Sequence, residues 1–453
     1  MLYLFLFLFS FFSLFSQEDA FQEKVTPHTL KLGDEALEYT VTVSPGKVGA
    51  ISYIKNTTEN RPITFAFNGG PGSSSVWLHL GALGPRRVLT PEEGQTNHAP
   101  YQLTDNLETI LDLTDLVFID PTGTGINTEE NQDCYPVKGD IESISHFIRN
   151  YLTETKRWNS PKYFAGESYG ATRALGIADY LQSEFGIFPN GLILISCALD
   201  FQTFIFAQDN LLPYLLFFPT YATTARYHGL ISPEKSTKEV AKLARQFVFE
   251  KYASALICPS CFDQEPIYRE VSNLSGLPYK LIKKKRGRIA EDLFYKELLA
   301  DQEVMVGRMD SRVTGHFNNA LQDPSITTIQ GIFSGGFHEY LHKELDVQSS
   351  YTLFSKNVNF NWNFHDYNPW GYPSLMYALR NTLQSNPKMK LFVACGYYDL
   401  ATPFAAIEYS LNHLDQPDAS IQLEYYEGGH MFYLSQSPRE KFKKDLIKFF
   451  DTH

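Results

Sequence analysis

Short apolar runs recur through most of the chain, and amphipathic stretches separate several of them. Helix-like patterns cover Ile141–Thr155 and Ala171–Phe185. The apolar runs are Ile63–Asn68, Leu116–Asp120, Lys162–Ala165, Gly191–Ile195, Lys390–Ala394 and Gln422–Tyr426. Runs that are apolar throughout are typical of strands buried on both faces. Their alternation with helices predicts a mostly parallel central sheet with helices on both faces.

Two other parts of the chain have different patterns. Tyr39–Val43 and Gly49–Ile54 alternate apolar and polar residues, which predicts antiparallel strands at a sheet edge. Between Phe201 and about Trp370 the strand signals fade, and helix-like segments such as Pro233–Tyr252 and Arg288–Gln302 take over. We therefore expect one α/β core, in two parts at 17–200 and 371–453, with a large mainly helical insertion at 201–370.

The first sixteen residues, Met1–Ser16, are almost all Leu and Phe, and no charged side chain precedes Glu18. The run is shorter than the ~20 residues that span a bilayer, and it has no polar face. It predicts a signal peptide at 1–16, with the mature chain beginning near Gln17. A retained N-terminal anchor is the alternative. We expect a secreted or periplasmic protein with no integral membrane span after the signal is removed.

Composition narrows the classes of partner. Hydrophobic residues make up 43% and charged residues 20%, enough to bury a large core. The net charge is −12, which argues against a nucleic-acid partner because such proteins need a basic face. Five cysteines are too few for a disulfide scaffold. Cys258 and Cys261 form a C-x-x-C pair that predicts a local disulfide or free thiols, since a zinc site needs a second ligand pair.

The strongest chemical signal is Gly166-Glu-Ser168-Tyr-Gly170. It follows a predicted strand and precedes a predicted helix, which is the context of a nucleophile elbow. The two glycines allow the sharp turn that presents the Ser168 hydroxyl at the end of a sheet. This context predicts the α/β-hydrolase fold, with Ser168 as nucleophile.

A serine nucleophile needs a base, and the base needs an acid that orients it. In hydrolases with this elbow the acid and then the histidine follow the serine along the chain. Asp399 lies just after the predicted strand Lys390–Ala394, and His430 lies in a Gly-Gly-His loop after Gln422–Tyr426. We therefore predict Asp399 as the acid and His430 as the base.

A glycine-rich loop, Asn68-Gly-Gly-Pro-Gly-Ser-Ser74, follows the predicted strand Ile63–Phe67. Such enzymes carry an oxyanion loop at this place, where glycines let backbone N–H groups approach the substrate. A phosphate-binding loop is the rival interpretation, but the lysine and helix context of a P-loop are missing.

Together these motifs resemble the serine carboxypeptidase family, in the order Asn-Gly-Gly-Pro-Gly-Ser-Ser, Gly-Glu-Ser-Tyr-Gly, Gly-x-x-Asp and Gly-Gly-His-Met. Val306-Gly-Arg-Met-Asp-Ser311 suggests its bacterial branch. The resemblance implies that Ser168, Asp399 and His430 are the catalytic triad and that the N–H groups of Gly70 and Tyr169 form the oxyanion hole. It also implies that Asn68, Gly69 and Glu167 bind the terminal carboxylate of a peptide substrate.

Three positions depart from the family pattern. Ser73 stands where relatives often have a cysteine, so a disulfide there is absent. Ala82 stands where relatives often carry a second glutamate, which puts carboxylate recognition in question. Tyr397 replaces the first acid of a Gly-Asp-x-Asp loop and leaves Asp399 as the carboxylate of that loop.

The sequence thus predicts an exported serine-type carboxypeptidase that hydrolyses peptides with a free C-terminus through an acyl-enzyme, without metal or organic cofactor. An esterase or acyltransferase on the same scaffold is the alternative, because fold and triad do not set the acceptor. A catalytically inactive binding protein is a third reading, and the intact nucleophile, base and acid argue against it.

Overall fold

The central sheet is the frame on which the candidate residues are mounted. A computed structural model describes residues 22–126, 131–316, 323–365, 371–416 and 420–451. The predicted signal peptide at 1–16 lies outside these residues. Within the described ranges, no helix has the length and apolar character needed to cross a membrane.

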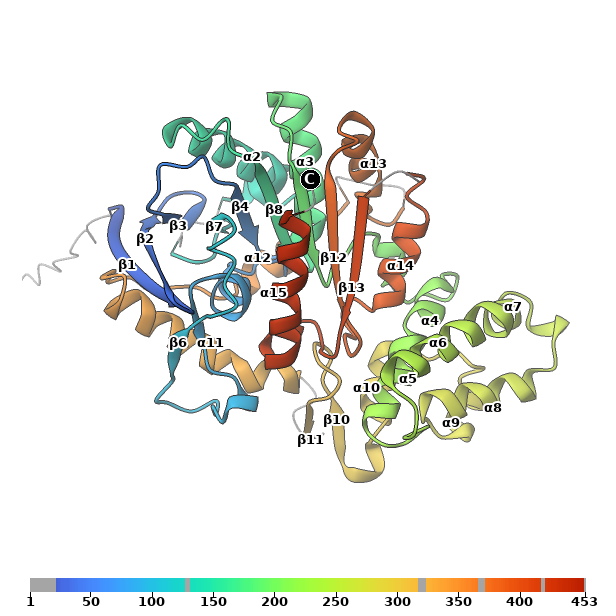
Figure 1. The fold of residues 1–453 in the computed structure, drawn as a ribbon. Helices are drawn as coiled ribbons and strands as arrows, with labels where there is room; N and C mark the ends of the chain where they lie inside the picture. The colour runs from blue at the N-terminus through green and yellow to red at the C-terminus, as the bar shows by residue number, and fades with distance from the viewer. Residues whose placement is uncertain (1–21, 127–130, 317–322, 366–370, 417–419, 452–453) are drawn as a thin grey trace, which may run out of the picture.

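Nine of the described strands form one sheet in the order β1-β2-β3-β7-β4-β8-β9-β12-β13 (Figure 1). The pairs from β1 to β7 are antiparallel, and those from β7 to β13 are parallel. Their bounds are β1 Lys24–Leu32, β2 Glu35–Ser44, β3 Gly49–Lys55, β7 Asp115–Asp120, β4 Ile63–Phe67, β8 Lys162–Glu167, β9 Gly191–Ile195, β12 Lys390–Gly396 and β13 Ser420–Tyr426. The predicted α/β class and mostly parallel sheet are confirmed.

The edge strand β1 was not predicted. It contains Pro27, which cannot donate a hydrogen bond to a neighbouring strand. An outermost strand tolerates such a residue because one of its sides has no partner strand.

Alternate residues of the parallel strands are buried on opposite faces. On β4, Phe65 packs into one core and Ala66 into the other. The Phe65 face is covered by α2 (Val137–Glu154), α3 (Tyr169–Phe185), α13 (Met376–Ser385) and α14 (Phe404–Asn412). The Ala66 face is covered by α11 (Pro324–Lys343) and α15 (Gln436–Asp451) (Figure 1). Burial on both faces explains why these strands are apolar throughout.

The chain between β9 and β12 packs in two parts. Residues from Leu215 to Val306 form their own hydrophobic core, to which Leu400 also belongs. That part holds α4 Leu212–Leu216, α5 Phe218–Tyr227, α6 Thr237–Phe247, α7 Ala253–Ile257, α8 Gln264–Ser275, α9 Tyr279–Lys284, α10 Glu291–Glu297 and β10 Val304–Val306. In contrast, α11 buries Phe333 and Phe337 in the main core. The boundaries at 201 and 370 stay a prediction.

Smaller elements complete the described chain, and two of them lie beside the candidate site. Residues His79–Leu83 form a π-helical turn, and residues Phe432–Leu434 form a 3-10 turn. The others include α1 Val76–Leu78, β5 Arg86–Val88, β6 Leu103–Asp105, β11 Thr314–His316, α12 Lys356–Asn361 and further short helical turns.

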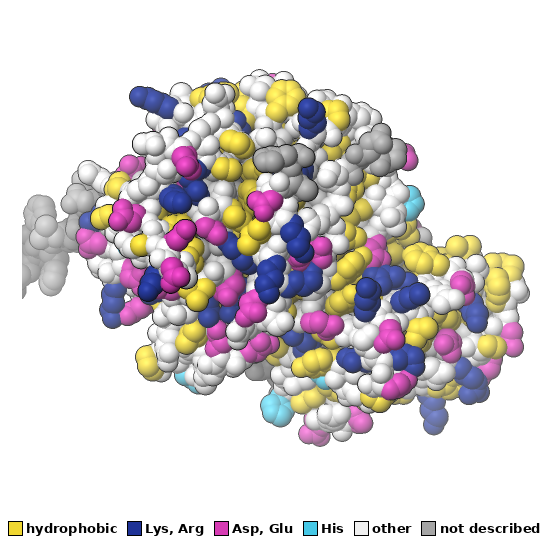
Figure 2. Space-filling view, in the orientation of Figure 1, with side chains coloured by type: hydrophobic (Ala, Val, Ile, Leu, Met, Phe, Trp, Pro, Cys, Tyr) yellow, Lys and Arg dark blue, Asp and Glu magenta, His cyan; other side chains and the backbone are white. Residues whose placement is uncertain are grey.

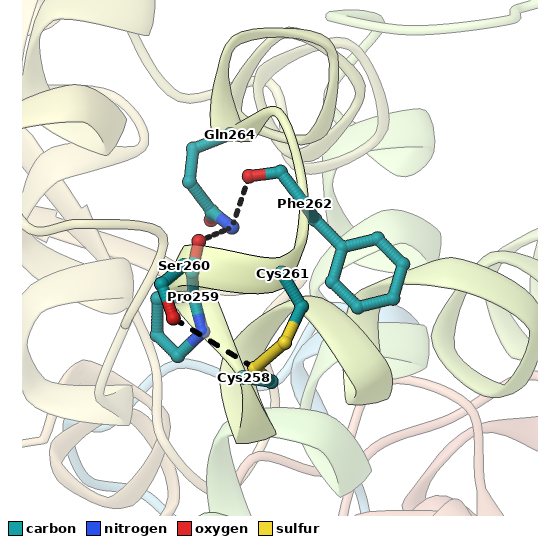
Figure 3. The surroundings of a disulfide bond; sticks show 6 residues. All are labelled: Cys258, Pro259, Ser260, Cys261, Phe262 and Gln264. Carbon is teal, nitrogen blue, oxygen red and sulfur yellow. Dashed lines mark hydrogen bonds between the residues drawn. A yellow bond between two sulfur atoms is a disulfide. The ribbon is translucent and has the colours of Figure 1, made fainter.

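At the tip of the helical part, Cys258 and Cys261 form a disulfide (Figure 3). It lies between the end of α7 and the start of α8. The local disulfide expected as one reading of the C-x-x-C pair is therefore formed. Side chains nearby, such as Ile257 and Phe262, are exposed. Figure 2 shows acidic and basic side chains interspersed over the face drawn there.

Candidate active site

The candidate residues follow the ends of parallel strands. Strand β4 ends at Phe67, β8 at Glu167, β12 at Gly396 and β13 at Tyr426. Because β4, β8, β9, β12 and β13 run parallel, these ends lie along one edge of the sheet. Open α/β sheets bind ligands at the carboxyl ends of their parallel strands. The topology therefore brings the three predicted loops to the same side of the protein.

Ser168 occupies a strained turn between β8 and α3. Its backbone has φ 61° and ψ −126°, in the left-handed half of the conformational map that residues other than glycine rarely adopt. A Cβ atom at Gly166 would lie 2.2 Å from the Gly170 carbonyl oxygen, so the turn is too tight for a side chain there. The Ser168 N–H donates to the Ile195 carbonyl at 3.0 Å. This geometry is that of a nucleophile elbow.

Asp399 and His430 are hydrogen-bonded to each other. His430 Nδ1 lies 2.8 Å from Asp399 Oδ2, and both side chains are buried. The His430 carbonyl accepts a hydrogen bond of 2.6 Å from the Ser196 hydroxyl, directly after β9. With Nδ1 turned to Asp399, the other ring nitrogen, Nε2, is the atom left for a substrate-side proton transfer.

The Asp399 carboxylate is held by its own loop. The N–H groups of Ala401 and Thr402 donate to Oδ1 at 2.7 and 2.9 Å. The Thr402 hydroxyl donates to Oδ2 at 2.7 Å and lies 3.1 Å from His430 Nδ1. Burial disfavours a charge on His430, but the Asp399 carboxylate outweighs burial, so the pKa of His430 is raised. The pair is therefore built to stabilise an imidazolium.

The glycine-rich loop after β4 touches the elbow. A Cβ atom at Gly69 would lie 2.5 Å from the Tyr169 nitrogen, so only glycine fits there. Gly70 follows with φ +102°, a conformation that favours glycine. The backbone around Gly69 and Gly70 thus approaches the Tyr169 N–H group that begins α3. These two predicted oxyanion positions lie on segments in direct contact.

Glu167 is a buried acid at the end of β8. Burial raises its pKa to about 7, against the opposing effects of His430 and of hydrogen bonds from Tyr433 and Asn68. The Tyr433 hydroxyl donates to Glu167 Oε2 at 2.5 Å. Asn68 Oδ1 accepts from the Leu78 N–H at 3.1 Å, which leaves the amide group of Asn68 as the end that donates to Glu167. Glu167 can therefore be protonated at acidic and neutral pH.

A buried ion pair between α3 and α2 supports the start of the glycine-rich loop at Asn68. Arg173 on α3 donates to Asp140 Oδ2 at 2.8 Å and to the Asn68 carbonyl at 2.6 Å. The Tyr169 hydroxyl also donates to Asp140, at 3.2 Å. Removing one partner would leave the other charge buried and uncompensated. The network fixes the Asn68 backbone relative to helix α3.

Residues 307–313, between β10 and β11, hold both later loops of the site. The Met309 carbonyl accepts from the His430 N–H at 2.6 Å, and the Arg308 carbonyl accepts from the Leu400 N–H at 3.1 Å. The Ser311 N–H donates to the Tyr398 carbonyl at 3.0 Å. Sequence analysis used this segment only as a family signature and did not predict its contacts.

Thr402 and Tyr433 were also missed. Both lie within three residues of a predicted catalytic residue, Thr402 after Asp399 and Tyr433 after His430. Their hydroxyl groups bind the carboxylates of Asp399 and Glu167. Proximity to a predicted acid or base was the one signal that could have marked them.

The comparisons with known proteins agree with the resemblance seen in the motifs. The family model described as serine carboxypeptidase matches residues 51–428. The match contains Ser168 and Asp399 and ends two residues before His430.

Among solved structures, the chain is similar to Kex1, a prohormone-processing carboxypeptidase from Saccharomyces cerevisiae, with a TM-score of 0.55 and 15% identity over 94% of this chain and 91% of that one. A proline iminopeptidase from Mycobacterium smegmatis gives a TM-score of 0.38 and 12% identity over 94% and 97% of the chains. A carboxyl esterase from Bacillus coagulans gives 0.40 and 11% over 95% and 98%.

Proposed function

The chain belongs to the serine carboxypeptidase family and is a serine-type carboxypeptidase, and we propose that it is exported and releases C-terminal residues from peptides through an acyl-enzyme on Ser168. The observation that carries the mechanism is the buried pair of Asp399 and His430, whose side chains lie 2.8 Å apart. The pair and the strained Ser168 turn both come just after the carboxyl ends of parallel strands in the same sheet. Export rests on the apolar leader at 1–16.

The proposed reaction follows the usual steps of serine hydrolysis. The Ser168 oxygen attacks the scissile carbonyl while His430 Nε2 takes the hydroxyl proton. The N–H groups of Gly70 and Tyr169 bind the oxyanion that forms. His430 then gives the proton to the leaving amino group, and the C–N bond breaks. Water repeats the sequence on the ester, which releases the shortened peptide and restores Ser168.

Glu167, Asn68 and the Gly69 backbone are proposed to bind the terminal carboxylate of the substrate. An ionised Glu167 would repel this carboxylate, whereas a protonated Glu167 can donate a hydrogen bond to it. Burial raises the pKa of Glu167 to about 7, so the protonated form is available in acid without a second glutamate at Ala82. Preference for a free C-terminus should therefore be strong in acid and fade as pH rises through neutrality.

We also propose a division of the chain into a catalytic core and an insertion. The catalytic core is formed by 17–200 and 371–453, and the helical insertion at 201–370 shapes the substrate site. The separate core between Leu215 and Val306 supports a specificity role for that part. Residues after α11 also border the oxyanion loop, since a Cβ atom at Gly70 would lie 3.3 Å from the Phe354 ring and the Asn359 amide donates to the Pro71 carbonyl at 2.8 Å.

Covalent labelling tests the acyl-enzyme. An organophosphonate should add its mass to the peptide that contains Ser168, at a rate that follows the ionisation of His430. The Ser168→Ala variant should take up no label. A Ser196→Ala variant offers a matched control. Ser196 lies near His430, and the substitution removes only the hydrogen bond from the Ser196 hydroxyl to the His430 backbone carbonyl. Labelling elsewhere, or none in the wild type, would remove Ser168 as nucleophile.

A further inference from the structure

Tyr433 is the phenol partner of Glu167 and is itself fully buried. It lies in the 3-10 turn Phe432–Leu434, just after His430. Its hydroxyl donates to Glu167 Oε2 at 2.5 Å. The Tyr433 carbonyl accepts from Arg439 at 3.3 Å, which fixes the backbone of the turn.

The Tyr433 ring lies against the π-helical turn His79–Leu83. A Cβ atom added to Gly81 would lie 2.8 Å from Tyr433 Cε2, so the glycine makes room for the ring. The next residue is Ala82, the position where relatives often carry the second glutamate. The phenol therefore reaches Glu167 beside the segment in which that second acid would stand.

We propose that Tyr433 is a positioning residue for carboxylate recognition: by binding Oε2 of Glu167, it directs the acidic proton to Oε1, the oxygen left to donate to the terminal carboxylate of the substrate. This inference rests on the proposed function. It differs from the proposed role of Glu167 itself, because it assigns the direction of the proton to a tyrosine.

The argument follows from donors and acceptors. The Tyr433 hydroxyl donates to Glu167 Oε2, and burial with the neighbouring Glu167 holds the pKa of Tyr433 well above its usual value, so the phenol keeps the proton that it donates. An oxygen that already accepts from this phenol cannot also point its own proton at it. The carboxyl proton of Glu167 is thus placed on Oε1. In a pair of two carboxyl groups, by contrast, either residue could carry the shared proton.

Three other groups face Glu167 and set its titration together with Tyr433. The charge of His430 lowers the pKa of Glu167, the charge of Asp399 raises it, and the Asn68 amide lowers it. Removing the phenol while these remain withdraws a donor that favours the ionised carboxylate. The Tyr433→Phe variant should therefore hold the Glu167 proton to higher pH, but with the proton no longer confined to Oε1.

The experiment is the ratio of kcat/KM for a peptide acid and its matched amide, measured from pH 4 to 9. In the wild type this ratio should fall with a midpoint near neutrality. In Tyr433→Phe the midpoint should rise by roughly one pH unit, the loss of one hydrogen bond to a charged group. The ratio on the acidic plateau should also decrease. Tyr426→Phe is the matched control, because it removes a buried tyrosine bond to Asp445 on another helix.

Two further variants separate positioning from a structural role. With 3-fluorotyrosine at position 433, which packs alike and donates more strongly, the midpoint should fall. In a Glu167→Gln background, Tyr433→Phe should move no midpoint. An unmoved midpoint in both position-433 variants, or equal losses for acid and amide, would overturn the inference. A wild-type ratio that is constant with pH would instead overturn the proposed role of Glu167.

Discussion

The Asp399→Asn variant is expected to test the catalytic pair most severely. Two backbone N–H groups, those of Ala401 and Thr402, donate to Asp399 Oδ1. The oxygen of an asparagine would take that place, and its NH₂ group would then face His430 Nδ1, where Oδ2 now lies at 2.8 Å. His430 would be forced to accept at Nδ1 and to carry its proton on Nε2, the tautomer that cannot take a proton from Ser168.

The size of the effect follows from the same contacts. Turning the amide around would set its NH₂ group against two buried N–H donors, at about 1–3 kcal/mol for each donor left unpaired. The flipped amide, which would again place an oxygen acceptor opposite His430 Nδ1, is therefore rarely populated. Loss of the negative charge beside the imidazolium adds to this, and we expect kcat to fall about 10⁴-fold, or about 5 kcal/mol in the barrier.

The assay is kcat on a peptide acid, with enzyme concentration fixed by absorbance and folding checked by thermal unfolding. Asp445→Asn is the control, because Asp445 is a buried carboxylate that accepts from Tyr426 away from the site. It should keep wild-type kcat. If Asp399→Asn loses less than about ten-fold in kcat while folded, the tautomer argument is wrong.

Three other outcomes are expected. Ser168→Ala, His430→Ala and their double variant should have nearly equal residual kcat, because triad members act as a unit; additive losses would contradict this. Glu167→Gln should raise the melting temperature at pH 8 and change it little at pH 4.5. Burial raises the pKa of Glu167 to about 7 from 4.5, so the folded chain retains a proton that the unfolded chain releases, and stability falls as pH rises across that window; equal shifts at both pH values would refute it. Cys258→Ser with Cys261→Ser should lower stability by at most about 2 kcal/mol, because the closed loop is short, and leave kcat unchanged; a large loss of kcat would show that the disulfide shapes the site.

The sheet and the triad candidates could be predicted because their signals are local. Gly191–Ile195 was predicted with the bounds that the structure shows, since a strand buried on both faces is apolar at every position. The elbow around Ser168 is encoded by the two glycines on either side of it, Gly166 and Gly170, and by the strand and helix that flank them.

What escaped prediction depends on contacts between distant segments. Met309 binds His430 through its backbone carbonyl, which carries no side-chain signature. The Tyr433 hydroxyl reaches Glu167 across the sheet edge, and a tyrosine near a histidine has no pattern that indicates its partner. The division of the helical insertion was also hidden, because apolar residues along a helix do not indicate which of two cores they join.

One digestion tests the central claim most directly. A peptide with a free C-terminus, its amide and its N-acetylated form are incubated at acidic pH, and products are followed by mass spectrometry. We predict stepwise loss of residues from the C-terminus of the free and N-acetylated acids, slower loss from the amide, and none with Ser168→Ala. Internal or N-terminal cleavage, or hydrolysis of a matching ester without any cleavage of the peptide acids, would contradict the account.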